Sequence, residues 1–267
     1  MRLTIDHRTT YRFTAPQGRI VQLLRMTPRN THDQTVAEWN IAVDCDARLR
    51  EHRDGFGNLT TMLYAEGPLD DIEITVSGEV VTSASGGVLH GTFEPLAPAL
   101  YLRSTPATQA EAALAAFAQE ATGGQKSADA LHALGNALRD RFAIVGGRPE
   151  PGLTATAAFA RETATARDMA QLFVAAARAA GVPARYVTGY CDVLQDGGHP
   201  TPHGWADGWI DGTGWVAFDP TLGITPEEHH VRVAVALDAA GCSPVAGSRL
   251  GEGRESLDVE VQVVGEA

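Results

Sequence analysis

Three short motifs in the second half of the sequence carry side chains that could act together as a catalytic triad. His203 opens one predicted strand, Asp219 closes the next, and residues 165–168 (TARD) have the Thr-x-x-Asp spacing that caps the start of a helix. A helix start offers free N–H groups and the positive end of the helix dipole, which lower the pKa of a thiol and stabilise an oxyanion. The pattern therefore predicts a cysteine nucleophile at the helix start, with His203 as its base and Asp219 as the carboxylate that orients the base.

The position expected to hold that nucleophile is occupied by Ala166. A methyl group cannot attack a carbonyl carbon, and because triad members act as a unit, loss of the nucleophile lowers kcat by a factor on the order of 10⁶. We therefore take Ala166, His203 and Asp219 as candidate catalytic positions and expect no covalent acyl transfer. Amidase and transamidase activity on peptide or glutamine substrates should stay at background.

Periodicity and turn residues predict the elements that hold these side chains. A helix begins near Ala166 behind its cap, Thr165, and three strands follow it, over residues 184–193, 203–210 and 215–219. The last two strands form a hairpin. If its loop has an odd number of residues, for instance 211–213, Asp219 lies diagonally from His203 on the same face of the sheet, within side-chain reach.

The composition of the chain changes near residue 100. Before that point, short alternating segments and turn signals predict an antiparallel β-sandwich domain. After it, helices are predicted to start behind a capping pair, Thr108 and Glu111, and behind Ser127. Alternation returns at residues 231–235 and 257–263 and predicts more strands. We therefore expect an α+β protein with a β-sandwich domain at residues 1–100 and a core at residues 101–267 that includes the C-terminal strands.

Composition and charge restrict the partners and the location. The 267 residues are 44% apolar and 20% charged, which is typical of a soluble globular protein, and 21 Lys+Arg against 33 Asp+Glu give a net charge of −12. A negative chain without a basic cluster repels a phosphate backbone, so we expect no nucleic acid partner. Three distant cysteines, no secretory leader and no apolar run of roughly 18 residues favour a cytoplasmic protein with no membrane partner and no cofactor.

Longer stretches of the sequence resemble the bacterial transglutaminase-like proteins, which combine an N-terminal β domain with a transglutaminase core of the papain-like cysteine protease fold. The resemblance covers nearly the whole chain and rests on TTYRF at residues 9–13, DGFGN at 54–58, AQLFVAAARAAGVPARYVTGY at 170–190 and HHVRVAVALD at 229–238. It implies a core of the cysteine peptidase or acyltransferase class, which takes a peptide or protein acyl substrate. The family's His-Ala-Trp strand matches residues 203–205, and its Phe-Asp-Pro-Thr motif matches residues 218–221, so two of the three triad positions carry over.

The resemblance also places Ala166 at the nucleophile position, because the family's Gly-x-Cys-Gln/Arg-Asp signature matches residues 164–168 (ATARD). Two neighbouring motif positions depart as well, since Ala164 replaces the family's glycine and Gly204 replaces its alanine. These departures favour natural loss of the cysteine over deliberate replacement, because an engineered change would leave the rest of the motif intact. Trp205 and Arg167 adjoin the triad positions and are the candidate substrate-binding residues.

Three functions remain open. The first is a catalytically inactive module that binds a peptide or acyl group or assembles with a partner protein. The second is a cysteine-dependent peptidase or protein-glutamine acyltransferase whose native sequence has cysteine at position 166. The third is an enzyme that uses Cys191 or a metal. Metal ligands would have to come from a set of histidines and acids whose spacing matches no zinc pattern well, so we expect no metal: His199, His203, His229, His230, Asp192 and Asp196.

Overall fold

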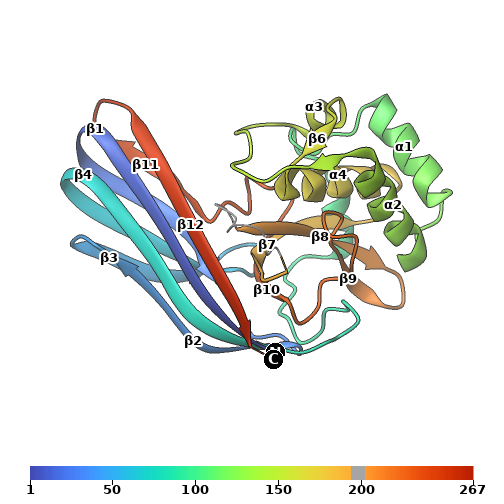
Figure 1. Cartoon of the computed structure of the whole chain (residues 1–267), viewed down its shortest axis with the longest axis horizontal. Coiled ribbons are helices and arrows are strands. Elements are labelled where there is room, and N and C mark those ends of the chain that lie inside the picture. Colours follow the sequence, from blue (N-terminus) through green and yellow to red (C-terminus); the bar gives the residue numbers. More distant parts are fainter. Residues whose placement is uncertain (194–201, 267) are drawn as a thin grey trace.

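Two antiparallel sheets lie side by side in the computed structural model, and helices cover one face of the second sheet (Figure 1). The structure describes residues 1–193 and 202–266. A strand-rich N-terminal part is followed by a part that mixes helices and strands, which confirms the predicted α+β fold class.

The first sheet is built on two long neighbouring strands that bend. Its members within the first hundred residues are β1 (Arg2–Thr27), β2 (Gln34–Val43), β3 (Ala47–Arg53) and β4 (Leu59–Thr82). β1 and β4 pair along most of their length, with a shift of register between Arg12 and Gln17, while β2 and β3 pair with opposite ends of β4. Side chains from both halves, including Leu24, Leu63 and Ile74, share one buried cluster. The predicted sandwich is therefore a single sheet folded over its own core.

The C-terminal strands complete this first sheet and do not belong to the core. β12 (Glu255–Glu266) pairs with the first half of β1, and β11 (Val245–Leu250) pairs with its second half (Figure 1). The predicted assignment of the strand at residues 257–263 to the second domain is therefore wrong, whereas the strand predicted at residues 231–235 does lie in the second sheet, and the β domain consists of two separate stretches of the chain. Alternating apolar residues predict that a strand forms, but they do not say which strand it pairs with.

Helices precede and cover the second sheet. They are a 3₁₀ helix, η1 (Pro98–Leu102), and the α-helices α1 (Ala112–Thr122), α2 (Ala128–Arg141), α3 (Ala155–Phe159) and α4 (Ala166–Ala179). Ser127 caps α2 as predicted. The predicted cap of α1 by Thr108 is wrong, because the Thr108 hydroxyl is buried and accepts a hydrogen bond from Arg178 instead. Within the described ranges, no helix is both long enough and apolar enough to span a bilayer.

The second sheet is antiparallel, with the strand order β10-β7-β8-β9. Its strands are β7 (Ala184–Cys191), β8 (His203–Ile210), β9 (Gly214–Phe218) and β10 (His230–Ala236), and a short parallel pair, β5 (Ala143–Ile144) and β6 (Thr163–Ala164), leads into α4. The inner face of α4, which includes Met169, Leu172 and Phe173, packs on this sheet in one large apolar cluster. The β8 boundaries predicted from the sequence are confirmed.

Two buried amide side chains of the β domain cover the outer edge of β10. Gln34 accepts from the N–H of Arg232 at 2.8 Å and donates to its carbonyl at 2.9 Å. Asn58 does the same at Val235, with distances of 2.9 and 2.8 Å. Each amide therefore replaces the hydrogen bonds of a neighbouring strand, and together they attach the β domain to the strand that begins at His230.

Candidate active site

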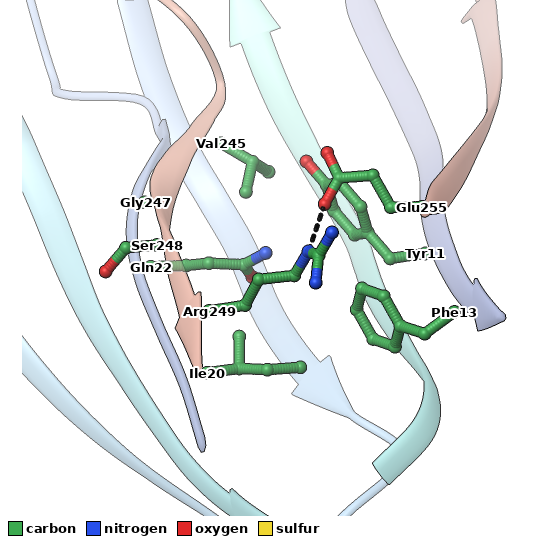
Figure 2. A pocket seen from close by; sticks show the side chains of 9 residues that line it. All are labelled: Tyr11, Phe13, Ile20, Gln22, Val245, Gly247, Ser248, Arg249 and Glu255. Carbon is green, nitrogen blue, oxygen red and sulfur yellow. Dashed lines mark hydrogen bonds and ion pairs between the residues drawn. The ribbon is translucent and has the colours of Figure 1, made fainter. Parts of the chain in front are cut away.

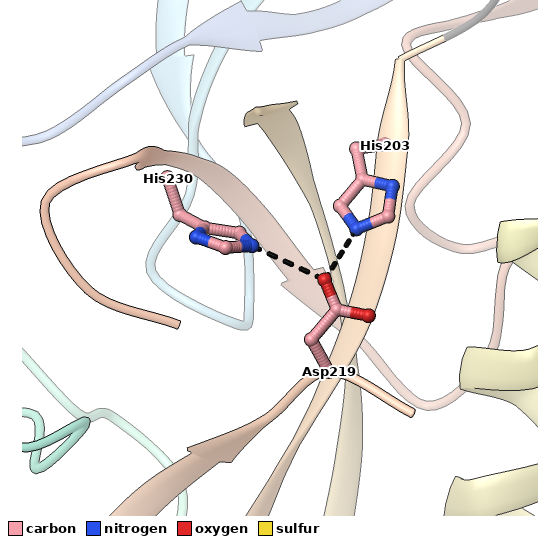
Figure 3. A group of neighbouring side chains, drawn as sticks. All are labelled: His203, Asp219 and His230. Carbon is pink, nitrogen blue, oxygen red and sulfur yellow. Dashed lines mark hydrogen bonds and ion pairs between the residues drawn. The ribbon is translucent and has the colours of Figure 1, made fainter. Parts of the chain in front are cut away.

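His203 and Asp219 meet at one end of the second sheet. His203 is the first residue of β8, Asp219 directly follows β9, and the pairing of Ile210 with Gly214 leaves an odd-numbered turn, residues 211–213. His203 Nε2 donates to Asp219 Oδ2 at 2.6 Å, and both side chains are buried (Figure 3). The hydrogen bond predicted from the loop length is therefore present.

A second imidazole shares the same carboxylate oxygen. His230, the first residue of β10, donates from Nε2 to Asp219 Oδ2 at 3.1 Å (Figure 3). The sequence analysis treated His230 only as a candidate metal ligand and missed this contact. Its place at the start of the alternating segment with Val231 and Val233 indicated a strand end, but no local signal shows that β10 lies across β7 from β8.

Four donors hold the Asp219 carboxylate in its ionised form. Oδ2 accepts from the two imidazoles, and Oδ1 accepts from the backbone N–H groups of Thr221 at 2.9 Å and Leu222 at 3.1 Å. Burial by itself raises the pKa of Asp219, but the attraction of His203 and the hydrogen bonds from both rings outweigh it and hold that pKa well below its usual range. Asp219 is therefore a buried anion without a guanidinium or ammonium partner among the described residues.

The shared carboxylate fixes the tautomer of both rings. Since each Nε2 donates to an ionised carboxylate, each neutral ring presents Nδ1 as an acceptor. Neither Nδ1 has a hydrogen-bond partner among the residues that the structure describes. Burial lowers the pKa of His230, and the neighbouring His203 lowers it further against the opposing pull of Asp219. The Nδ1 atom of His203, on the side of the ring away from Asp219, thus has a lone pair that is available to a ligand.

The start of α4 lies across from His203. Ala166 is the first residue of the helix, and Thr165 and Asp168 form the predicted capping box, with Thr165 Oγ1 accepting from the Asp168 N–H at 3.3 Å. A Cβ placed on Gly204 would lie 3.6 Å from the Cα of Arg167, which shows how closely the helix start approaches β8. Ala166 and His203 line one cavity of about 60 Å³. The structure therefore brings the three candidate positions to one place.

Two matches with known families cover most of the chain. Residues 3–81 match the bacterial transglutaminase-like N-terminal region, and residues 115–220 match the transglutaminase-like superfamily. The second match includes Ala166, His203 and Asp219. The chain belongs to the transglutaminase-like superfamily.

Relatives of this transglutaminase-like chain match it over nearly its whole length. An uncharacterized protein of Mycobacterium leprae is 24% identical over 98% of this chain and 98% of its own length. One of Mycobacterium tuberculosis is also 24% identical, over 98% of this chain and 92% of its own length. The crystal structure of a "Putative Cysteine Protease from Cytophaga hutchinsonii" has a TM-score of 0.78 at 20% identity, covering 99% of this chain and 90% of that chain. The last similarity establishes a shared fold.

The two candidate substrate-binding residues of this transglutaminase-like core differ in position. Arg167 lines the cavity beside Ala166 and donates to the carbonyl of Glu150 at 3.1 Å, so its side chain borders the cleft. Trp205 is only 1% exposed, and its ring stacks beside His203 with centroids 6.0 Å apart. The predicted contact of Trp205 with a substrate is therefore not supported, and its packing supports the His203 ring instead.

The geometry favours hydrogen bonding over metal binding at the histidines. Among the described residues, His203, Asp219 and His230 are the one group whose ligand atoms could surround an ion. The carboxylate oxygen that would bind an ion already accepts from both rings, and the other oxygen accepts two N–H groups. Of the other residues weighed as ligands, His229 donates to Asp192 at 2.7 Å, while His199 and Asp196 lie outside the described residues.

Neither Cys191 nor Cys242 carries an activated thiol. Cys191 is buried at the end of β7, and burial raises the pKa of its thiol to about 12. Burial also raises the pKa of Cys242 well above its ordinary value. Neither residue lies at a helix start, where the dipole would lower a thiol pKa.

A second cavity, of about 200 Å³, lies in the β domain, away from the histidines (Figure 2). The guanidinium of Arg249 in its wall is already paired, since Arg249 Nε donates to Glu255 at 3.0 Å and Arg249 Nη1 donates to the neighbouring Gln17 at 2.8 Å. Aromatic rings of Tyr11 and Phe13 form one wall. The residues that line this cavity include no base or nucleophile comparable to His203.

Proposed function

We propose that this chain is a transglutaminase-like module that binds a peptide or acyl group beside His203 without forming a covalent intermediate with it. The observation that carries the proposal is the position of Ala166. It is the first residue of a capped helix and lines the same cavity as His203, and the resemblance to the family implies a cysteine at this position. A methyl group there leaves the cleft in place and removes the covalent chemistry.

The walls of the cleft support an extended, partly apolar ligand. Ile144 and Val145 are 41% and 40% exposed at its rim, and Pro149 and Pro202 also line it. The start of α4 supplies N–H groups and the positive end of the helix dipole to a carbonyl or carboxylate oxygen. We therefore propose a peptide or acyl group as the ligand. We also propose the cytoplasmic location that the sequence predicts.

The intact pair of His203 and Asp219 favours a second candidate function. A buried carboxylate and imidazole at 2.6 Å are the arrangement that a cysteine protease or acyltransferase needs beside its thiol. If the native residue at position 166 is cysteine, the chain is an enzyme of that class with a replaced nucleophile. The codon at position 166 in the source genome decides between the two.

Binding can be tested with fluorescein-labelled, glutamine-containing peptides whose neighbouring side chains are apolar, acidic or basic. We expect saturable binding that Ala166→Leu weakens by about tenfold or more, which corresponds to at least about 1.4 kcal/mol. Ala116→Leu is the matched control, because Ala116 is exposed on α1, away from the cleft. Absence of binding across the whole panel, or equal weakening by both substitutions, would contradict the proposal.

A further inference from the structure

We propose that His203 acts as a general base toward a water molecule in the cleft, so that the protein hydrolyses thioesters bound there without an acyl-enzyme. This activity goes beyond the proposed binding function and rests on it, because the acyl group must first bind at the start of α4. It requires a base with an available lone pair, a place for water beside that base, and donors for the carbonyl oxygen.

The base is His203 Nδ1. Its other ring nitrogen donates to the Asp219 carboxylate at 2.6 Å, so the neutral ring carries its proton on Nε2 and presents Nδ1 unprotonated. The side chain is 2% exposed, and Nδ1 has no partner within residues 1–193 and 202–266. Figure 3 shows this nitrogen pointing away from Asp219. When Nδ1 takes a proton, the buried carboxylate stabilises the imidazolium.

A second unpartnered polar atom marks the place for the water. Thr221 Oγ1 is buried without a hydrogen-bond partner in the described part of the chain, and Thr221 lines the same cavity as His203 and Ala166. A water molecule needs roughly 10–15 Å³ and two to four polar partners, whereas this cavity has about 60 Å³. Alanine at position 166 leaves free the space that a cysteine sulfur would take. Water there would satisfy both orphaned atoms.

The start of α4 supplies the donors for the carbonyl oxygen. The first N–H groups of a helix have no partner inside the helix. Thr165 satisfies those of Asp168 and Met169, through its hydroxyl and its carbonyl, which leaves those of Ala166 and Arg167 for a ligand. Both residues line the cavity. An oxyanion formed there would also lie at the positive end of the helix dipole.

The reaction is a hydrolysis that needs no further reactant. His203 Nδ1 removes a proton from water while the water oxygen attacks the thioester carbon, whose oxygen becomes an oxyanion held by the helix start. The intermediate then expels the thiolate as the C–S bond breaks, and the imidazolium returns its proton to the sulfur. The products are a carboxylic acid and a thiol. Amides stay intact, because an amine is a far poorer leaving group than a thiolate.

Thioesters of N-acetylglycine and N-acetylvaline with a small thiol test the proposal, with the loss of thioester absorbance as the readout. We expect saturable hydrolysis without a burst, and a loss of about 10²-fold or more in His203→Gln, which is the range for a general base. Thr221→Val should lower the rate, while Thr221→Ser should restore it. His52→Gln is the matched control for surface imidazole, because His52 is exposed on β3.

Three results would overturn the proposal: equal rates in His203→Gln and His52→Gln, a linear dependence on thioester concentration, or an initial burst of one thiol per chain. Thermal unfolding of each variant shows whether a lost rate reflects a lost fold. Binding of the labelled peptides is measured on the same preparations. Peptide binding without thioester hydrolysis would refute this inference and leave the proposed binding function standing, whereas loss of both would refute the two together.

Discussion

Asn58→Ala should destabilise the protein strongly, because it removes the two hydrogen bonds that the Asn58 amide makes to the outer edge of β10. Asn58 is 0% exposed, and its amide satisfies the N–H and the carbonyl of Val235, itself 1% exposed. Alanine leaves both backbone groups buried without a partner, at about 1–3 kcal/mol each, so we expect a loss of about 2–6 kcal/mol in the free energy of unfolding. Such a loss is a large part of the roughly 5–15 kcal/mol typical of native proteins.

Urea denaturation of both proteins gives the difference directly, and hydrogen exchange at the Val235 amide reports the local effect. Asn40→Ala is the matched control, because Asn40 is exposed on β2 and the same atoms are removed there. A loss below about 0.5 kcal/mol in Asn58→Ala, equal to that of the control, would refute the claim that Asn58 replaces a neighbouring strand, since surface changes typically fall in that range.

Three further outcomes follow from buried groups. Burial lowers the pKa of His7 to about 4 in the folded protein, so the unfolded chain binds more protons than the folded one below about pH 6.5. The free energy of unfolding should therefore fall by about 3 kcal/mol between pH 7 and pH 4. Urea titrations measure this fall, which should be smaller in His7→Gln. Gly204→Ala should cost about 1–3 kcal/mol, because its Cβ would overlap the buried Tyr186 hydroxyl, and unchanged thermal unfolding would contradict this packing. Cys191 should react with iodoacetamide on the order of 10³-fold more slowly than an ordinary thiol because its pKa is about 12, and rapid alkylation at neutral pH would revive a displaced nucleophile.

Local signals in the sequence were sufficient for the parts of the site that lie close together along the chain. The Thr165 and Asp168 pair predicted the start of α4, because a capping box depends on residues three apart. The three-residue turn at 211–213 set the register of β8 and β9 and so placed His203 diagonally from Asp219. These contacts depend on period and loop length, both of which can be read from the sequence.

Long-range pairing decided the features that the sequence did not reveal. β11 and β12 pair with β1 at the opposite end of the chain, and His230 reaches Asp219 only because β10 is placed beside β7. Trp205 was a candidate substrate contact, yet Phe56 of the β domain packs against its side of the sheet and it is 1% exposed. No pattern within one strand encodes which surface another domain will cover.

The rate of thiol alkylation in Ala166→Cys tests the central claim most directly. If position 166 faces His203 at the start of α4, the helix dipole and the imidazole should generate a thiolate, and the introduced thiol should react with iodoacetamide near pH 6 far faster than a free thiol. Adding His203→Gln in the same chain should abolish most of that gain, while adding His52→Gln should not. If the thiol of Ala166→Cys reacts at the rate of a free thiol, with no dependence on His203, the assignment of Ala166 to the nucleophile position is contradicted.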